Sequence, residues 1–348
     1  MSPSLWSLRS LPSSQSHHVR TSFPGIPLLF LTGVRFHDSF RKKGTMRTLI
    51  TTLTLILFSC TVSLAHPSWG IVVDAEGKIY FVDVTHNGDG TLWAYDPDTE
   101  TLTPLRKWFH AHNLTLNADQ EMHSAIAIWR TGEVEGEGHN YLFQYHPETD
   151  QLDTLLFTDD WDLFHGGQYA LSHTMQEAYF PMDGELRAHS LIDGTTRTID
   201  FPFERITTLA TGPNGYLWIS DSRYKDGTIL RWSPETGFEE IITHFFPEDR
   251  SNALFENRNH QIFYGLGFSE HCNLLVGESV ERALWEITGT GEKIRRYQSP
   301  KNWMPTGIYY RDGKYYVLEY GFDRGHLGPR IVVFDRDFEV LQRLEFVY

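Results

Sequence analysis

A phrase of thirteen residues recurs along this chain, and it limits the fold more than any other feature of the sequence. In its clearest form it reads GIVVDAEGKIYFV: a short apolar run, a turn with Asp and Gly, and a second apolar run. The second runs are rich in β-branched and aromatic residues, so each copy predicts two antiparallel strands joined by a tight turn. The copies lie at 70–82, 113–125, 169–181, 208–220, 265–277 and 307–319.

After each copy, a variable loop leads to a third run, a turn and a fourth run. These are clearest at 90–105, 140–156 and 227–242, where the turns read Asp-Pro-Asp-Thr, His-Pro-Glu-Thr and Ser-Pro-Glu-Thr. Proline sets φ in such turns, and the acidic and hydroxyl side chains bond local backbone amides. The pattern predicts an all-β fold, a six-bladed β-propeller of four-stranded antiparallel blades. The blades are expected to begin near residues 66, 108, 163, 204, 260 and 303.

The residues ahead of the repeats have a different character. Residues 1–45 are rich in Ser, Arg and Pro, and we interpret them as a non-native or disordered N-terminal extension. The next stretch, MRTLITTLTLILFSCTVSLA, has the charged, apolar and small-residue order of a secretory signal peptide. We therefore expect residues 46–65 to be removed and the propeller to span 66–348 in a secreted or periplasmic protein. A lipoprotein anchored at Cys60 is the less favoured alternative, because the bulky Phe58 fits that signal poorly.

The charge of residues 66–348 limits which partners they can bind, and their cysteine content limits which disulfides they can form. The first 65 residues hold seven of the 30 Lys and Arg and one of the 45 Asp and Glu, so 23 basic and 44 acidic residues remain. The resulting net charge of −21 disfavours nucleic acid as a partner, because the surface repels phosphate. Cys272 is the one cysteine left, so no internal disulfide can form. We expect a monomer without a transmembrane segment that binds a small molecule or an envelope protein.

The stretches PSWGIVVDAEGKIYFVD and MPTGIYYRDGKYYVLE resemble the strand pairs of NHL-repeat and gluconolactonase-like (senescence-marker-protein) propellers. The resemblance covers nearly all of 66–348 and implies the six-bladed fold. It also implies a hydrolase in which a Glu, an Asp and Asn residues hold one divalent cation where blades begin. The corresponding positions here are Trp69, His112, Thr207 and Thr306, and none is a carboxylate, so that ligand set does not carry over.

Histidines gather on one expected face of the propeller. The loops between second and third strands return to the face on which the first strands begin, and eight of the fourteen histidines of 66–348 fall there. They are His66, His86, His110, His112, His139, His165, His260 and His326. By contrast, His123 falls in a second strand, where we expect it to be packed.

Two of these histidines are spaced to act together. Residues two apart in a strand point to the same side, so His110 and His112 can present two imidazoles at the start of one blade. With His165 of the next blade and His66 of the first, they form a candidate site for a divalent metal, Zn²⁺ or Ca²⁺. A polar channel without metal is the alternative. The predicted substrate-binding neighbours are Glu121, Trp69, Thr306 and Trp303.

Two functions from different classes are consistent with these sequence features. The first is a metal-assisted hydrolase or lyase acting on a small carbonyl or sugar-derived substrate, with the cation polarising a carbonyl or activating water. Peptidylglycine-amidating lyase, another six-bladed propeller, is similar in using histidines from separate blades around a metal. The second is a non-catalytic propeller that binds a small ligand or an envelope protein, and the fold does not choose between them.

Overall fold

The structure, a computed structural model, describes residues 68, 70–84, 90–117, 119–129, 138–159, 168–182, 185–201, 206–246, 263–321 and 328–346. All of them belong to one structural unit, Leu64–Tyr348. The expected extension and signal peptide lie outside the described residues. Within the described part of the chain, no helix has the length and apolar character needed to cross a membrane.

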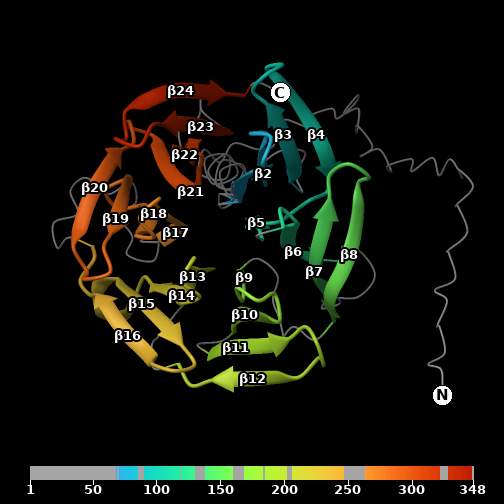
Figure 1. Ribbon diagram of the computed structural model, residues 1–348, viewed down its shortest axis with the longest axis vertical. Coiled ribbons are helices and arrows are strands. Elements are labelled where there is room, and N and C mark those ends of the chain that lie inside the picture. Colours follow the sequence, from blue (N-terminus) through green and yellow to red (C-terminus); the bar gives the residue numbers. More distant parts are fainter. Residues whose placement is uncertain are drawn as a thin grey trace, which may run out of the picture. The chain divides into compact units, whose positions relative to one another are not determined.

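The described strands form six antiparallel sheets of four strands each, arranged as blades around a common axis (Figure 1). Blade 1 holds β1 (Ile71–Val73), β2 (Ile79–Asp83), β3 (Thr91–Asp96) and β4 (Thr101–Lys107). Blade 2 holds β5 (Thr115–Leu116), β6 (Met122–Trp129), β7 (Gly138–His146) and β8 (Gln151–Thr158). Blade 3 holds β9 (Ala170–Leu171), β10 (Glu177–Met182), β11 (Glu185–Ser190) and β12 (Thr196–Ile199).

The second half of the ring repeats this plan and confirms the predicted six-bladed propeller. Blade 4 holds β13 (Ile206–Thr211), β14 (Leu217–Asp221), β15 (Thr228–Ser233) and β16 (Gly237–Ile242). Blade 5 holds β17 (Phe263–Phe268), β18 (Leu274–Glu278), β19 (Ala283–Ile287) and β20 (Lys293–Gln298). Blade 6 holds β21 (Trp303–Arg311), β22 (Lys314–Gly321), β23 (Pro329–Phe334) and β24 (Val340–Glu345).

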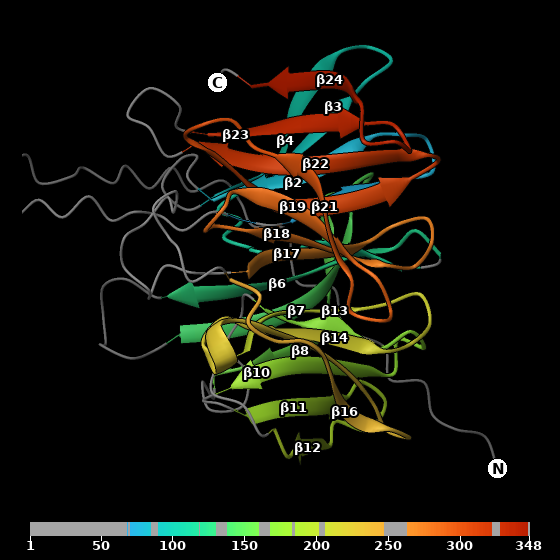
Figure 2. The ribbon, with the colours of Figure 1, turned by 90° about the vertical axis from the view of Figure 1, so that its left-hand side faces the viewer.

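The turn between first and second strands shares one backbone feature in every blade. At least one residue of each turn adopts a positive φ, which glycine tolerates without steric cost and other residues adopt less readily. Three blades place glycine there and three do not: the residues are Gly77, Gln120, Met175, Gly215, Cys272 and Gly313. These turns lie on the face of the propeller opposite the short 3₁₀ helix (Tyr224–Asp226) that joins β14 to β15 (Figure 2).

Side-chain alternation on the middle strands divides each blade between its two neighbours. On blade 1, Tyr80 and Val82 belong to the apolar cluster shared with blade 2. The intervening residues, such as Phe81, belong to the cluster shared with blade 6. Six such clusters of buried side chains occur among the described residues. Both faces of a blade are therefore buried, which explains why the inner and middle strands are apolar on both sides.

Among the described strands, the ring closes by packing rather than by a strand shared between the first and last blades, a point that the sequence left open. Each sheet consists of four consecutive strands, and this holds for the first and last blades as well. The Phe346 ring after β24 stacks on Phe81 with centroids 4.7 Å apart, and the Tyr320 hydroxyl donates to the Val82 carbonyl at 2.9 Å. Arg311 of blade 6 also contacts blade 2, because its Nη1 donates to Gln120 Oε1 at 2.8 Å.

Removing the closing aromatic ring should destabilise the fold. Because Phe346 stacks on the fully buried Phe81, Phe346→Ala is expected to lower the free energy of unfolding by about 2 kcal/mol. The matched control is Leu341→Ala on β24, whose side chain is exposed and whose loss should cost less than about 0.5 kcal/mol. Urea unfolding of both variants measures the difference, and equal losses would show that the stacked ring does not close the propeller.

Candidate functional site

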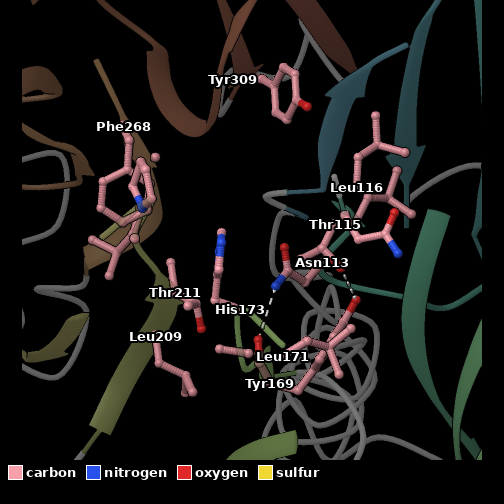
Figure 3. Close-up of a pocket in the computed structure, with 18 of the residues that line it drawn as sticks. Asn113, Thr115, Leu116, Tyr169, Leu171, His173, Leu209, Thr211, Phe268 and Tyr309 are labelled. Atoms are coloured by element: carbon pink, nitrogen blue, oxygen red, sulfur yellow. Dashed lines mark hydrogen bonds between the residues drawn. The ribbon is translucent and has the colours of Figure 1, made fainter. Parts of the chain in front are cut away.

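The six inner strands surround a channel that contains a cavity of about 420 Å³ (Figure 3). This size lies within the range of small-molecule sites. Every inner strand contributes to its lining: Ile71, Asn113–Leu116, Tyr169–Leu171, Thr208–Thr211, Leu266–Phe268 and Ile308–Tyr310 take part. Turn residues also take part, among them Asn117, His173 and Pro213, so the cavity lies toward the hairpin turns. The histidine site predicted from the sequence lies instead toward the opposite face, where the inner strands begin.

His173 is the imidazole of this cavity. It lies in the turn between β9 and β10 and projects into the open space, with Tyr309 on the opposite wall (Figure 3). The sequence-based prediction did not include this residue, because His173 is not among the eight histidines expected on the face where the first strands begin. A usable signal was its position directly after the apolar run of the third copy, where the inner strand ends beside the channel.

Two polar residues of β5 and its approach lie against blade 3. Asn113 Nδ2 donates to the Tyr169 carbonyl at 3.3 Å, and in Figure 3 its Oδ1 faces the cavity. The Thr115 hydroxyl pairs with the Tyr169 hydroxyl at 3.0 Å. Burial raises the pKa of Tyr169, so its hydroxyl stays protonated and available for that bond. The amide of Asn113 is thus oriented by blade 3 and presents an acceptor to the cavity.

On the blade 6 side, the lining residue Tyr309 neighbours the cation Arg311, which does not itself line the cavity. Burial raises the pKa of the Tyr309 hydroxyl, and the neighbouring Arg311 guanidinium opposes this rise. Arg311 itself is engaged by Gln120 at 2.8 Å and by the Asp312 carboxylate at 3.3 Å. Among the described residues that line the cavity, none is Asp, Glu, Lys or Arg.

His110 and His112 lie together ahead of β5, as their spacing predicts. Their ring centroids are 4.9 Å apart with an interplanar angle of 85°, and the Ser68 hydroxyl donates to the His112 carbonyl at 3.1 Å. They are not among the described residues that line the cavity. Across the described ranges, no group of three or more His, Cys, Asp or Glu side chains could hold a metal ion. The other two predicted ligands, His66 and His165, lie outside those ranges.

The predicted substrate-binding residues are spread over different places. Thr306 is buried in β21, where its hydroxyl donates to the Leu318 carbonyl at 3.3 Å. Trp303 is buried beneath the Arg330 guanidinium, which lies 3.9 Å from its ring centroid. Glu121 is exposed and accepts from Asn117 Nδ2 at 2.6 Å. None of the three lines the cavity within the described part of the chain, and Trp69 is not described.

His123 lies in β6 and is 1% exposed, the packed position that we expected for it. Burial lowers the pKa of its imidazole, which favours the neutral form. It is therefore a histidine of the blade core.

Buried carboxylates stand at the ends of second strands, and two of them hold the loops that follow. Asp221 Oδ1 accepts the backbone N–H groups of Arg223 and Tyr224 at 2.8 and 3.0 Å. Glu278 accepts the N–H groups of Val280, Glu281 and Ala283. The equivalent carboxylates of blades 1 and 6 are Asp83 and Glu319, and all four are at most 1% exposed. The loop contacts of Asp221 and Glu278 explain their burial without a metal.

The fold and the cavity define the chain as a six-bladed β-propeller with a small-molecule-sized cavity in its channel. No family model matches the sequence, and no curated protein sequence matches it either.

Solved structures of similar fold come from proteins with different activities. Virginiamycin B lyase from Staphylococcus aureus superposes with a TM-score of 0.50 at 13% identity, covering 80% of this chain and 84% of that one. A protein described as a gluconolactonase gives 0.53 at 16% identity, covering 80% and 91%. TolB from Acinetobacter baumannii gives 0.54 at 13% identity, covering 78% and 64%. At these identities the similarity establishes the propeller fold alone.

The burial of Glu278 predicts a pH dependence of stability. Burial raises the pKa of its carboxyl from 4.5 to about 7, so between these values the folded protein keeps a proton that the unfolded chain releases. The contribution of Glu278 is therefore fully present below about pH 4.5 and is lost as pH rises to about 7. We expect the stability difference between native protein and Glu278→Gln to fall over this interval, by up to about 3 kcal/mol. Urea unfolding at both pH values measures it, and a constant difference would contradict the raised pKa of the Glu278 carboxyl.

Proposed function

We propose that this protein is a secreted or periplasmic ligand-binding propeller that holds one small molecule in its channel cavity. The observation that carries the proposal is the cavity of about 420 Å³, lined from all six inner strands, with His173 projecting into it. Pockets of this size with a few convergent polar groups and apolar walls are where proteins hold small ligands. The location rests on the signal-like segment 46–65.

The composition of the lining favours binding over catalysis in this cavity. General acid–base chemistry needs a group that takes or gives a proton, and nucleophilic catalysis needs a base beside the nucleophile. His173 is the imidazole among the described lining residues, and no carboxylate accompanies it there. Asn113, Thr115 and the apolar walls can orient a ligand but supply neither role.

Filling the cavity should abolish binding of an uncharged probe. Prodan, a neutral naphthalene dye whose emission reports a dry environment, is expected to bind the native protein saturably. His173→Trp places an indole in the open space and should weaken this binding by at least roughly tenfold. His271→Trp is the matched control, because His271 lies in the equivalent turn of blade 5 and does not line the cavity. Equal affinities of both variants, or no saturable binding by the native protein, would overturn the proposal.

A metal-assisted hydrolase or lyase acting on a small carbonyl or sugar-derived substrate is the second candidate. It is favoured by the His110 and His112 rings, whose centroids lie 4.9 Å apart at the start of blade 2. Two neutral imidazoles are suitable ligands for Zn²⁺, and a further histidine from another blade would complete a site that leaves a position open for water. Two of the solved structures with a similar fold, virginiamycin B lyase and the protein described as a gluconolactonase, carry the names of enzymes.

Metal content decides this second candidate. After incubation of the full chain with Zn²⁺ and removal of the excess, elemental mass spectrometry should find about one ion per chain. His112→Ala should remove it, whereas His244→Ala, at an exposed histidine after β16, should retain it. Metal bound equally by both variants, or by neither variant nor the native chain, would exclude the His110–His112 site.

A further inference from the structure

We infer that the ligand of the channel cavity is uncharged and carries an amide, or an equivalent pair of donor and acceptor, on an apolar body. This inference rests on the proposed function and names the ligand class of that site. Three features of the cavity support it: the backbone edges that surround it, the side chains that reach it, and the absence of formal charge among its described lining residues.

The first feature is the hydrogen-bonding edge of the inner strands. The strands β1, β5, β9, β13, β17 and β21 each stand at the end of their sheet, with one paired neighbour. An antiparallel edge strand leaves alternate N–H and C=O groups unpaired on its outer side. In a propeller that side faces the channel (Figure 1), so the ring offers donors and acceptors in similar number. A ligand with both kinds of group matches such a surface, as an added peptide strand matches a sheet edge.

The second feature is the small set of polar side chains. Asn113 is held by the Tyr169 carbonyl and turns its acceptor Oδ1 toward the cavity, and His173 projects from the next blade (Figure 3). A ligand N–H group can donate to Asn113 Oδ1, and a neutral imidazole can serve as donor or acceptor. Beside them lie the apolar surfaces of Leu116, Leu171 and Phe268, which suit a flat hydrocarbon body.

The third feature is charge. Among the described lining residues none is Asp, Glu, Lys or Arg. Arg311 neighbours the lining residue Tyr309 but does not line the cavity, and its guanidinium is engaged by Gln120 and Asp312. A carboxylate or ammonium group on the ligand would lose its hydration without gaining a counter-charge, which is costly. An amide of the same shape would lose less and recover hydrogen bonds from the channel.

The test compares three naphthalene derivatives of matched shape: naphthalene-2-carboxamide, 2-naphthoate and 2-naphthylmethylamine. Binding of each to the native full chain is measured by calorimetry at about pH 8, where the second is anionic and the third cationic. The carboxamide should bind at least roughly tenfold more tightly than either charged compound. The same titrations on His173→Trp and His271→Trp show whether the compounds occupy the cavity.

The outcomes separate the two proposals. If a charged compound binds as tightly as the carboxamide, and His173→Trp alone weakens it, the inference is wrong while the ligand-binding function stands. If binding is equal in both tryptophan variants, or if none of the three compounds binds at millimolar concentration, both proposals are overturned.

A charge placed in the cavity provides a second test. Asn113→Asp introduces a carboxylate where the amide stands and should raise the affinity for the cationic compound relative to the carboxamide by at least roughly tenfold. Asn214→Asp is the matched control, because Asn214 is exposed in the β13–β14 turn and does not line the cavity. The order of affinities of Asn214→Asp for the three compounds should be the same as that of the native protein. An unchanged ranking in folded Asn113→Asp would show that the ligands do not meet this residue.

Discussion

The apolar packing between neighbouring blades is the interaction that holds this propeller together. Alternation along the middle strands sends Tyr80 and Val82 toward one neighbour and Phe81 toward the other. A single blade has two apolar faces and can bury neither alone, so stability requires the complete ring. That requirement is met where blade 6 meets blade 1, through the Phe81–Phe346 stack and the Tyr320–Val82 hydrogen bond.

A closed ring has a necessary consequence for its centre. Each sheet ends at an inner edge strand, and six such edges meet around the axis (Figure 1). The channel is therefore surrounded by backbone polar groups, and side chains from strand ends and turns, such as Asn113 and His173, also line its cavity.

How much of the site could be predicted depends on whether the residues concerned lie close together in the sequence or far apart. Two-residue alternation predicts that His110 and His112 share a side, and their rings do lie close together. The repeat predicts the buried position of His123. Neither pattern shows that His173 reaches the cavity, because the direction of a turn side chain depends on the inner strand that leads into it and on the neighbouring blades. Nor do they show that Thr306 and Trp303 are buried inside blade 6.

Sequence patterns were sufficient to determine the number of blades, the four strands of each and the hairpin turns between first and second strands. These follow from local geometry: strand alternation, turn chemistry and the repeat are each set within a few neighbouring residues. The assembled ring was needed to show that its described strands close it by packing and that the cavity lies toward the hairpin turns. The physical reason is that closure and convergence join residues far apart in the chain, such as Gln120 with Arg311, and no local pattern records their distance.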